Sequence, residues 1–543
     1  MPRSNIQIPG IHPTGTIEIS AGASLGHTKI MTDLSLYNTL SRKLEPFVGR
    51  EPGRVGIYVC GPTAYDVPHA GHARAAVAFD TLVRHLQSLG LEVTYVRNIT
   101  DVDDKILERA KQTSEEPLEL SRRMAEIYQE QMRQVGCQEP THEPRVSQHL
   151  PQVIALIERL IERGAGYVLD LPSGTHDVYF AVRSFAGYGK LSRRRLEDLR
   201  VGARVAQDDR KRDPLDFALW KGTEPHEWGW DSPWGRGRPG WHIECSAMST
   251  HYLGHGFDIH GGGMDLIFPH HENEIAQCEA ANPETRVYAR WWLHNGFVNV
   301  DKEKMSKSLG NFVTVTDVLE RNDPEALRWF LLSVQYRGPI QFDTDKLPDG
   351  RVVFPGVDEA ERRVDYLYAT LQRLQELTGS GLTVPAKLPP ELRALRDAVG
   401  QAAEQATAGL NEDLNTPVAL AALQEIARIG NEVCDLCQKR RKDNTFVGAA
   451  TVAAQAVHTA LRRLAGTLGL HQTNQKEYLA RTTERRLRLR GLTAEQIYAE
   501  VDARTRARRE KDFARSDAIR DKLVGWGIRL RDTPGGTEWS IEA

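Results

Sequence analysis

Residues 55–96 constrain the fold of this chain more than any other part of the sequence. Residues 55–59 form a short apolar run of β-type residues, and the apolar residues of 71–89 recur at helical spacing until Gly90. A second β-type run follows at 91–96. A strand, a helix and a strand so close together predict a βαβ unit. Such a unit requires a parallel sheet, and ligands bind at the carboxyl ends of its strands.

A second α/β half is predicted from about residue 241 onward. Residues 257–260 are typical of a strand, 273–281 of a helix and 290–300 of another strand. We therefore expect a Rossmann-type parallel sheet built from two separated stretches of chain. The stretch between them, about 117–235, is expected to be an insertion that begins with helices.

The rest of the chain is predicted to be mainly helical. After residue 312 the helical pattern continues to about 470, interrupted by an irregular patch at 347–357. Residues 494–526 are helix-like and precede a short turn-rich tail. The polar stretch 1–33 is typical of a loosely ordered extension, and a true start at Met31 is an alternative explanation for it.

The composition excludes several classes of protein. No run approaches the roughly 18 consecutive apolar residues that a membrane span requires. Six cysteines in 543 residues do not make a disulfide framework, so we expect a cytoplasmic protein. The net charge of −3 excludes a uniformly basic surface. Residues 481–531 nevertheless hold 15 Lys and Arg against 8 Asp and Glu, which indicates either a polyanion contact or a solvated helix face.

Two histidines and a glycine lie between the first strand and its helix, in the loop Pro68-His69-Ala70-Gly71-His72. The N–H groups and the dipole of a helix N-terminus favour anions, and Gly71 lets a nucleotide approach the backbone closely. The loop therefore predicts a phosphate site. A metal half-site made by His69 and His72, or plain surface, are the alternatives.

Two lysines lie on a short loop, Lys304-Met305-Ser306-Lys307-Ser308, which Leu309-Gly310-Asn311 follows. Lysines so placed can stabilise a phosphate as negative charge develops on it. The alternative is an exposed basic turn. The glycine-rich phosphate motifs are absent, because 187–190 lacks the P-loop spacing and no GxGxxG follows a strand.

Four residues are candidates for a metal site. Cys60 ends the first strand, Cys245 lies in the second half, and His270 and Glu274 lie four residues apart on one predicted helix face. Two thiolates, an imidazole and a carboxylate suit zinc. The ligand spacing leaves a structural zinc site open as well as a catalytic one.

Other assignments of these residues stay open at this stage. A buried free cysteine is more often a packing residue than a ligand. His271 and Glu272 are adjacent alternatives to His270 and Glu274 as ligands. The remaining cysteines are expected to pack in the interior; they are Cys137, Cys278, Cys434 and Cys437.

The two loops together resemble the signatures of one enzyme class. His69-Ala70-Gly71-His72 resembles the HIGH signature of class I aminoacyl-tRNA synthetases, with alanine in place of isoleucine, and 304–308 matches their KMSKS signature. Over about 34–539, further stretches resemble the cysteine-specific family of that class, the cysteinyl-tRNA synthetases. These stretches are Tyr58-Val59-Cys60-Gly61-Pro62-Thr63, Arg97-Asn98-Ile99-Thr100-Asp101, 240–246, 257–265, 268–276 and parts of 515–537.

This resemblance implies how the domains are arranged. A Rossmann-type catalytic domain with its insertion would be followed by a stem-contact region, a helical bundle and a small domain that recognises the tRNA anticodon. Those parts would cover 34–312, 313–355, 356–475 and 476–543, after the extension 1–33.

The resemblance also implies the reaction and its cofactors. A monomeric cytoplasmic enzyme would ligate L-cysteine to tRNA(Cys) through cysteinyl-adenylate, with ATP as substrate accompanied by Mg²⁺. One Zn²⁺ would be held by Cys60, Cys245, His270 and Glu274, and the substrate thiolate would bind it directly. Zinc accepts a thiolate far more readily than a hydroxyl, whereas packing against one atom discriminates only ~10–200-fold. No editing domain would then be needed.

Further residue roles follow from the same resemblance. Thr100 and Trp241 would line the cysteine pocket, and His69, His72, Lys304 and Lys307 would act on the phosphates. The ATP and adenylate site would include Thr63, Gly71, Asn98, Gly263, Asp265 and Lys307.

Three competing interpretations remain. A related cysteine ligase that amidates an aminosugar in mycothiol synthesis resembles the catalytic half but lacks a long tail, whereas about 230 residues follow Lys307 here. A catalytically inactive zinc-binding or tRNA-binding homologue would need broken signatures. A zinc hydrolase is disfavoured because the HExxH motif is absent.

Overall fold

The computed structural model describes residues 33–172, 174–197, 210–224, 226–285, 287–300, 303–304, 312–348, 350–378, 387–533 and 536–542. The chain divides into two compact units, 1–31 and 32–543, and the fold described below belongs to the second. The predictions for the N-terminal extension and for Met31 therefore lie outside the described residues. Among the helices that the structure describes, none combines the length and apolarity needed to cross a bilayer.

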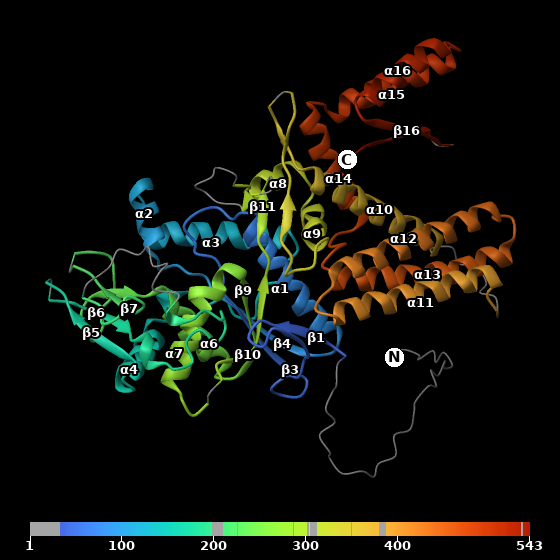
Figure 1. The fold of residues 1–543 in the computed structure, drawn as a ribbon. Helices are drawn as coiled ribbons and strands as arrows, with labels where there is room; N and C mark the ends of the chain where they lie inside the picture. The colour runs from blue at the N-terminus through green and yellow to red at the C-terminus, as the bar shows by residue number, and fades with distance from the viewer. Residues whose placement is uncertain are drawn as a thin grey trace, which may run out of the picture. The chain divides into compact units, whose positions relative to one another are not determined.

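A four-stranded parallel sheet forms the centre of the N-terminal half (Figure 1). Its strand order is β10-β9-β3-β4, with β3 (Arg54–Val59) paired to β4 (Glu92–Arg97) on one side and to β9 (Phe257–Gly263) on the other. The predicted βαβ unit is confirmed, because α1 (Ala70–Ser88) connects β3 to β4. The second predicted half supplies β9 and β10 (Ala289–Asn295).

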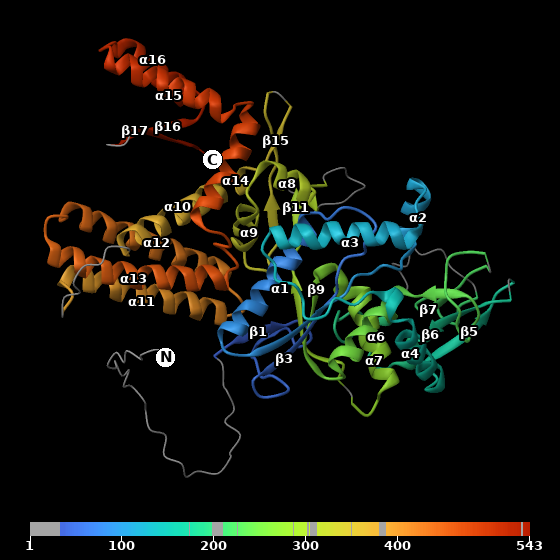
Figure 2. The same cartoon turned by 180° about the vertical axis from the view of Figure 1, so that it is seen from behind.

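Helices cover both faces of this sheet, which explains why its strands are apolar runs. Ile57 of β3 packs in one buried cluster with Phe79 of α1. Its neighbour Tyr58 points to the other face and packs with Met248 of α6 (Trp241–Leu253). Figure 2 shows α6 beside α7 (Glu272–Ala281) from behind. The successive residues of the strand thus serve two different cores.

The predicted strand 290–300 is wrong in one respect, because it is two strands in two sheets. β10 ends at Asn295, and β11 (Val298–Val300) pairs instead with β12 (Glu303–Lys304) and β13 (Ile340–Phe342). Gly296 lies at the break, where a Cβ atom would come within 2.4 Å of the Gly338 carbonyl oxygen. Close backbone approach therefore redirects the chain at this point.

The insertion contains helices and an antiparallel sheet. Its helices include α3 (Pro117–Gln134) and α4 (Leu150–Glu162), as predicted, and they follow α2 (Asp104–Thr113), which the sequence analysis missed. A four-stranded antiparallel sheet follows in the order β5-β6-β7-β8. Its strands are β5 (Gly166–Asp170), β6 (His176–Phe180), β7 (Phe217–Gly222) and β8 (Gly237–Pro239).

The C-terminal half is mainly helical, as predicted. After α8 (Val315–Arg321) and α9 (Pro324–Leu332), four long helices pack side by side (Figure 1). The four are α10 (Pro355–Thr378), α11 (Pro390–Asn411), α12 (Thr416–Lys439) and α13 (Asn444–Thr467). The irregular patch before them is a hairpin, β14 (Asp345–Lys346) and β15 (Val352–Val353), joined to the start of α10.

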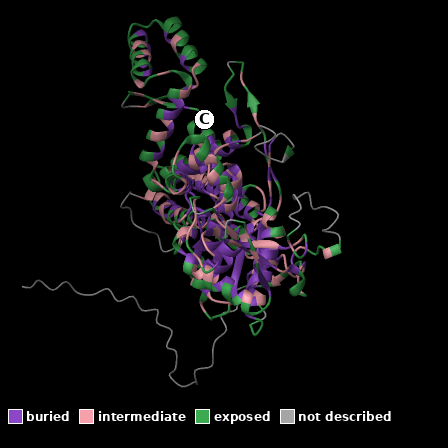
Figure 3. Ribbon diagram, turned by 90° about the vertical axis from the view of Figure 1, so that its left-hand side faces the viewer, coloured by how far each residue is buried: buried purple, intermediate pink, exposed green. Residues whose placement is uncertain are grey.

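The last part of the chain differs from its prediction in two places. The helix-like run 494–526 is two helices, α15 (Ala494–Arg509) and α16 (Phe513–Gly525), because Lys511 between them has a positive φ of 59°. The tail is a β-hairpin, β16 (Ile528–Thr533) and β17 (Gly536–Ile541). Figure 3 shows that α15 and α16 carry mostly exposed residues, in contrast to the buried parallel sheet.

An ion-pair network joins α14 (Gln475–Arg490) to the helices before it. Arg485 and Arg486 both donate to the carboxylate of Glu361 in α10. Arg481 donates to both carboxylate oxygens of Asp323, at 2.8 and 3.0 Å. Glu361 and Asp323 are at most 3% exposed, so their charges depend on these ion pairs. Arg486 pairs in addition with Asp365, and Arg481 with Glu325.

Candidate active site

A cavity of about 360 Å³ lies at the carboxyl ends of β3, β4 and β9, where the parallel sheet predicts a ligand. It brings together residues from both halves of the sequence. The histidine loop, the segment after β4, the start of α6 and the turn before α7 all contribute side chains. Predicted site residues on its wall include Thr63, His69, His72, Thr100, Trp241 and Asp265.

His69 and His72 cap the first turn of α1 and stack on each other at 3.7 Å between ring centroids. Nδ1 of His69 accepts the N–H of Gly71 at 3.0 Å, and Nδ1 of His72 accepts the N–H of His69 at 3.3 Å. In the neutral rings both protons are therefore on Nε2. The pair presents two N–H donors at a helix N-terminus, which is chemistry suited to phosphate oxygens.

The four predicted metal ligands converge at the edge of this cavity. Their ligand atoms lie within 4.8 Å of one another. Sγ of Cys60 lies 3.6 Å from Sγ of Cys245 and 3.6 Å from Oε1 of Glu274, and Nε2 of His270 lies 3.1 Å from the same Oε1. Two sulfurs, one imidazole nitrogen and one carboxylate oxygen at such spacing could hold a zinc ion.

The two thiols respond differently to their buried surroundings. The Cys60 thiol donates a hydrogen bond to Cys245 and lowers the pKa of Cys245 to about 6. Burial, with Cys245 close by, raises the pKa of Cys60 well above its ordinary value. A second thiolate beside the first is therefore costly, and a divalent cation is the group that would stabilise both.

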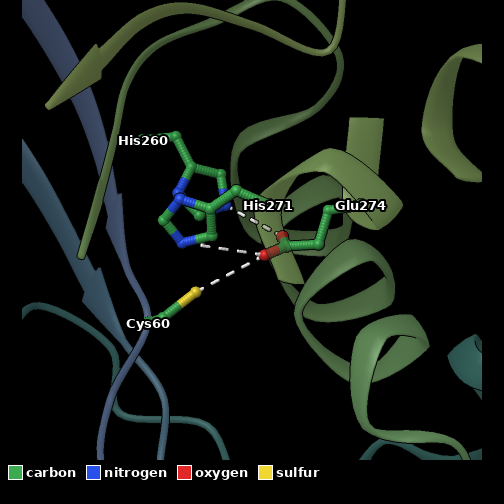
Figure 4. Close-up of side chains that lie close together, drawn as sticks. All are labelled: Cys60, His260, His271 and Glu274. Carbon is green, nitrogen blue, oxygen red and sulfur yellow. Dashed lines mark hydrogen bonds and ion pairs between the residues drawn. The ribbon is translucent and has the colours of Figure 1, made fainter. Parts of the chain in front are cut away.

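A second ligand set shares two members with the first. Figure 4 shows His260 of β9 and His271 beside Cys60 and Glu274, and these four also lie within 4.8 Å of one another. Nε2 of His260 donates a hydrogen bond to Oε2 of Glu274 at 2.9 Å, and Nε2 of His271 lies 3.9 Å from Oε1. The geometry alone thus offers two adjacent metal positions.

Access to the cavity distinguishes the two sets. Of the residues that differ between the sets, Cys245 and His270 line the cavity. His260 and His271 are fully buried and are not part of its lining. The Trp241 ring, also on the wall, stacks on His270 at 4.4 Å. A metal held by the predicted set would therefore face a bound substrate.

The residues behind the site hold its ligands in place. The hydroxyl of Tyr288 donates to Oε2 of Glu274 at 2.8 Å, so this oxygen is engaged on the side away from Cys60. His271 bonds His294 at 2.8 Å, and burial lowers the pKa of His294 to about 3 and that of His271 well below its ordinary value. His294 thus holds the His271 ring, which lies beside the Glu274 carboxylate without adding charge.

Two residues that the sequence analysis named as candidates for the site bind backbone N–H groups. Glu272, an alternative ligand, is fully buried and accepts backbone N–H groups of Gly189 and Ser192 at 3.0 and 2.7 Å. Asn98, predicted to lie along the adenylate, is buried behind the wall, and its Oδ1 accepts the N–H of Gly61 at 2.9 Å. A Cβ atom on Gly61 would lie 1.6 Å from the Asn98 carbonyl oxygen, so the close approach requires glycine.

The KMSKS lysines are only partly described. Lys304 is the last residue of β12 and is described by its backbone alone, and Lys307 lies outside the described residues. Their predicted roles therefore remain predictions.

Tyr65 and Lys105 are among the wall residues that sequence reasoning missed. Lys105 lies in the first turn of α2, where Asp103 accepts its N–H at 2.8 Å as a helix cap. An aspartate at a helix start is a known signal, so Asp103 could have predicted α2. The place of Lys105 on the cavity wall has no comparable signal.

Comparison with known proteins identifies the family. Residues 46–351 match the model of the tRNA synthetases class I (C) catalytic domain, and 407–472 match the DALR domain. A cysteine–tRNA ligase of Anaeromyxobacter sp. (strain K) is 45% identical over 94% of this chain and all of its own length. The chain belongs to the cysteine–tRNA ligase family. A chloroplastic/mitochondrial cysteine–tRNA ligase of Arabidopsis thaliana is 46% identical over 93% of this chain and 86% of its own.

A solved structure of much lower sequence identity is similar in fold alone. A methionyl-tRNA synthetase of Mycobacterium tuberculosis, solved with methionyl-adenylate, superposes with a TM-score of 0.57 at 15% identity. It covers 82% of this chain and 95% of its own. The predicted Rossmann-type fold of class I synthetases with a helical C-terminal region is thereby confirmed.

Proposed function

We propose that this chain ligates L-cysteine to tRNA(Cys) at the expense of ATP, through a cysteinyl-adenylate intermediate. The observation that carries the proposal is the cavity wall, where a histidine-capped helix start and a thiol-containing ligand set meet. One end of the cavity suits phosphates and the other suits a thiol. The near full-length relatives are named for the same ligation.

Zinc fits the donor set, and we assign it to Cys60, Cys245, His270 and Glu274. Two soft sulfur ligands favour zinc over magnesium or calcium. When bound, zinc would accept the thiolate of cysteine as a further ligand and would gain far less from the hydroxyl of serine. The Trp241 ring, stacked on His270, would form one wall of the position for the cysteine side chain.

The protein's own groups position the reacting atoms. In the first step a cysteine carboxylate oxygen attacks the α-phosphorus of ATP and pyrophosphate leaves. The Nε2–H donors of His69 and His72 would bind phosphate oxygens, and Thr63, Gly263 and Asp265 would orient the nucleotide. Mg²⁺ would accompany the ATP, and Lys304 and Lys307 would stabilise the charge that develops.

In the second step a ribose hydroxyl of the terminal tRNA adenosine attacks the cysteinyl carbonyl carbon, and AMP leaves. No protein nucleophile is needed, since the adenylate is already an activated ester. Thr100 and Trp241 would hold the cysteinyl group still during the transfer.

The C-terminal region supports a tRNA acceptor rather than an aminosugar. It continues beyond the DALR match into α14–α16, and residues 481–531 carry the net positive charge of +7. Exposed aromatic side chains accompany that charge: Tyr498 and Phe513 are 58% and 65% exposed. Exposed rings among cations are suited to stacking unpaired bases, as an anticodon domain requires.

Two further expectations belong to this proposal. All six cysteines are free thiols, which supports a reducing compartment such as the cytoplasm. We propose a monomer as the working form, in keeping with the resemblance to the family.

The experiment is ATP–pyrophosphate exchange by zinc-replete protein with cysteine or serine, followed by charging of total tRNA. Cysteine-dependent exchange with acid-precipitable cysteinyl-tRNA is the expected result. Exchange without charging would instead support the aminosugar ligase. Absence of both activities in zinc-loaded protein would contradict the proposal.

A further inference from the structure

In the proposed function the cavity binds the phosphates of ATP and of the tRNA, so cations on its wall could pair with them. Apart from histidines, the described side chains on its wall include two cations, Arg97 and Lys105. Arg97 is 5% exposed, and its Nη2 donates to Oε1 of Glu143 at 2.6 Å. Lys105 is exposed, and its ammonium forms no ion pair with any carboxylate in the described part of the chain. Its charge is available to a ligand.

Hydrogen bonds and ion pairs of neighbouring residues position the first turn of α2, although the Lys105 side chain itself is exposed. The neighbouring Asp104 accepts Nζ of Lys221 at 2.6 Å and Nη2 of Arg238 at 2.8 Å, from β7 and β8 of the insertion. The Asp103 side chain caps the same helix. Asp104 is thus already paired with two cations and does not neutralise Lys105.

The position of Lys105 separates it from the nucleotide end of the cavity. β4 is the edge strand of the parallel sheet, and Lys105 lies in the first turn of the helix that follows it. The histidine-capped helix follows β3, and Gly263 and Asp265 lie at the end of β9 and just after it, on the far side of β3. Lys105 thus lies on the edge-strand side of the cavity, next to an aspartate that contacts the insertion.

An aromatic ring accompanies this cation. Nζ of Lys105 lies 5.6 Å from the ring centroid of Tyr65, and both residues line the cavity. A cation beside an aromatic ring is the combination that binds single-stranded nucleic acid, because the ring stacks a base and the cation pairs with a phosphate. We propose that Lys105 binds a phosphodiester of the single-stranded 3′ end of the tRNA, with Tyr65 supporting a base beside it. This inference rests on the proposed function.

Lys105 would act in the second half-reaction. By pairing with the backbone near the terminal adenosine, it would hold the ribose hydroxyl against the cysteinyl carbonyl carbon. Its contribution to adenylate formation would be small, since the phosphates of ATP lie at the start of α1 in the proposed mechanism.

The test compares Lys105→Gln with Lys111→Gln and Lys105→Arg. Lys111 is the matched control, because it is an exposed lysine of the same helix that does not line the cavity. We expect Lys105→Gln to lower kcat/KM for tRNA about five- to tenfold, with cysteine-dependent exchange lowered at most about twofold. The slope of log kcat/KM against log salt should become shallower by about 0.7. Lys105→Arg should retain most of the tRNA-charging activity, and Lys111→Gln should leave that activity unchanged.

A second measurement locates the contact on the tRNA. Binding is compared for full-length tRNA and for tRNA that lacks its three 3′-terminal nucleotides. Lys105→Gln should weaken binding of the full-length tRNA only, because the truncated tRNA has already lost the contact. Equal weakening of both tRNAs, or parallel loss of exchange and charging, would overturn the assignment. Failure of the proposed function would look different: the wild-type protein itself would not charge full-length tRNA.

Discussion

The metal-ligand end of the parallel sheet and the region from α14 onward use charge in opposite ways. Around Glu274 the titratable groups are almost completely buried, and each has neighbours that fix its orientation. From α14 onward a buried ionic attachment leads into helices whose arginines and aromatic rings are exposed. The first arrangement suits discrimination between two substrates that differ by one atom, as cysteine and serine do. The second suits binding that sums many weak contacts, so single substitutions should have very different effects in the two regions.

Loss of a thiolate should produce the largest effect. Cys60→Ser replaces a soft ligand that also supports Cys245, so bound zinc should fall and kcat/KM for cysteine should drop at least about 100-fold. Metal analysis and exchange kinetics measure the two changes. Cys434→Ser, a buried thiol of the helical bundle, is the control and should change neither. Full zinc and normal kinetics in Cys60→Ser would refute the ligand assignment.

The two overlapping ligand sets can be separated by histidine substitutions. If His270 is the ligand and His260 only supports Glu274, His270→Ala should lose zinc, whereas His260→Ala should weaken zinc binding about 10–100-fold. Competition with a chelator measures both affinities. Complete metal loss in His260→Ala with retention in His270→Ala would favour the set drawn in Figure 4.

The attachment of α14 should be sensitive to a single carboxylate. Glu361→Gln would remove the carboxylate that Arg485 and Arg486 share, and should destabilise the protein by about 2 kcal/mol. The loss is limited because Arg485 keeps Asp323 as a partner and Arg486 keeps Asp365. Urea denaturation measures the change, and zinc content should be unaffected. The exposed ion pair of Glu359 with Arg362 in the same helix provides the control, so Glu359→Gln should cost less than about 1 kcal/mol. Similar costs for the two variants would contradict the buried-network account.

The same carboxylate predicts a pH dependence. Burial raises the pKa of Glu361, but Arg485 and Arg486 more than offset it and hold that pKa below its ordinary value. A carboxyl whose folded pKa is depressed stabilises the protein above its unfolded pKa, about 4.3, and loses that contribution as pH falls. Wild-type stability should therefore decrease below about pH 4.5 more steeply than that of Glu361→Gln. Identical pH profiles would show that Glu361 does not carry the effect.

The exposed C-terminal cations should have the smallest individual effects. Arg515 of α16 is exposed, and Arg515→Gln should lower tRNA charging only about two- to threefold, with the loss diminishing as salt rises. Cysteine-dependent exchange should not change. Lys442→Gln, which removes an exposed cation between α12 and α13, serves as the charge-matched comparison and should leave charging intact. Equal losses in the two variants would indicate a general charge effect.

The local sequence predicts the central parallel sheet because the strands of that sheet are buried on both faces and therefore form apolar runs. The runs at 55–59 and 91–96 and the helix between them predict the βαβ unit within one or two residues. The predictions of element boundaries failed where backbone contacts and backbone conformation determine where an element ends. Gly296 ends β10 because a neighbouring carbonyl lies against it, and Lys511 divides a continuous helical pattern through its positive φ. Neither effect has a periodic signal in the sequence.

The candidate site was predictable where chemistry and resemblance agree. The positions of Cys60, Cys245, His270 and Glu274 could be named before their convergence was known, and that convergence links residues more than 180 positions apart. The supporting residues could not be named in this way. His260 and Tyr288 acquire their contacts with Glu274 only from tertiary packing, which no spacing in the sequence records.

The most direct test of the account is the electronic spectrum of the cobalt(II)-substituted protein during titration with cysteine. Cys60 and Cys245 should already give thiolate-to-cobalt absorption, and the account predicts that cysteine increases it as a third thiolate binds. Serine should leave the spectrum unchanged. A cobalt-loaded protein whose spectrum does not respond to cysteine, although it still forms the adenylate, would contradict selection of the substrate by the metal.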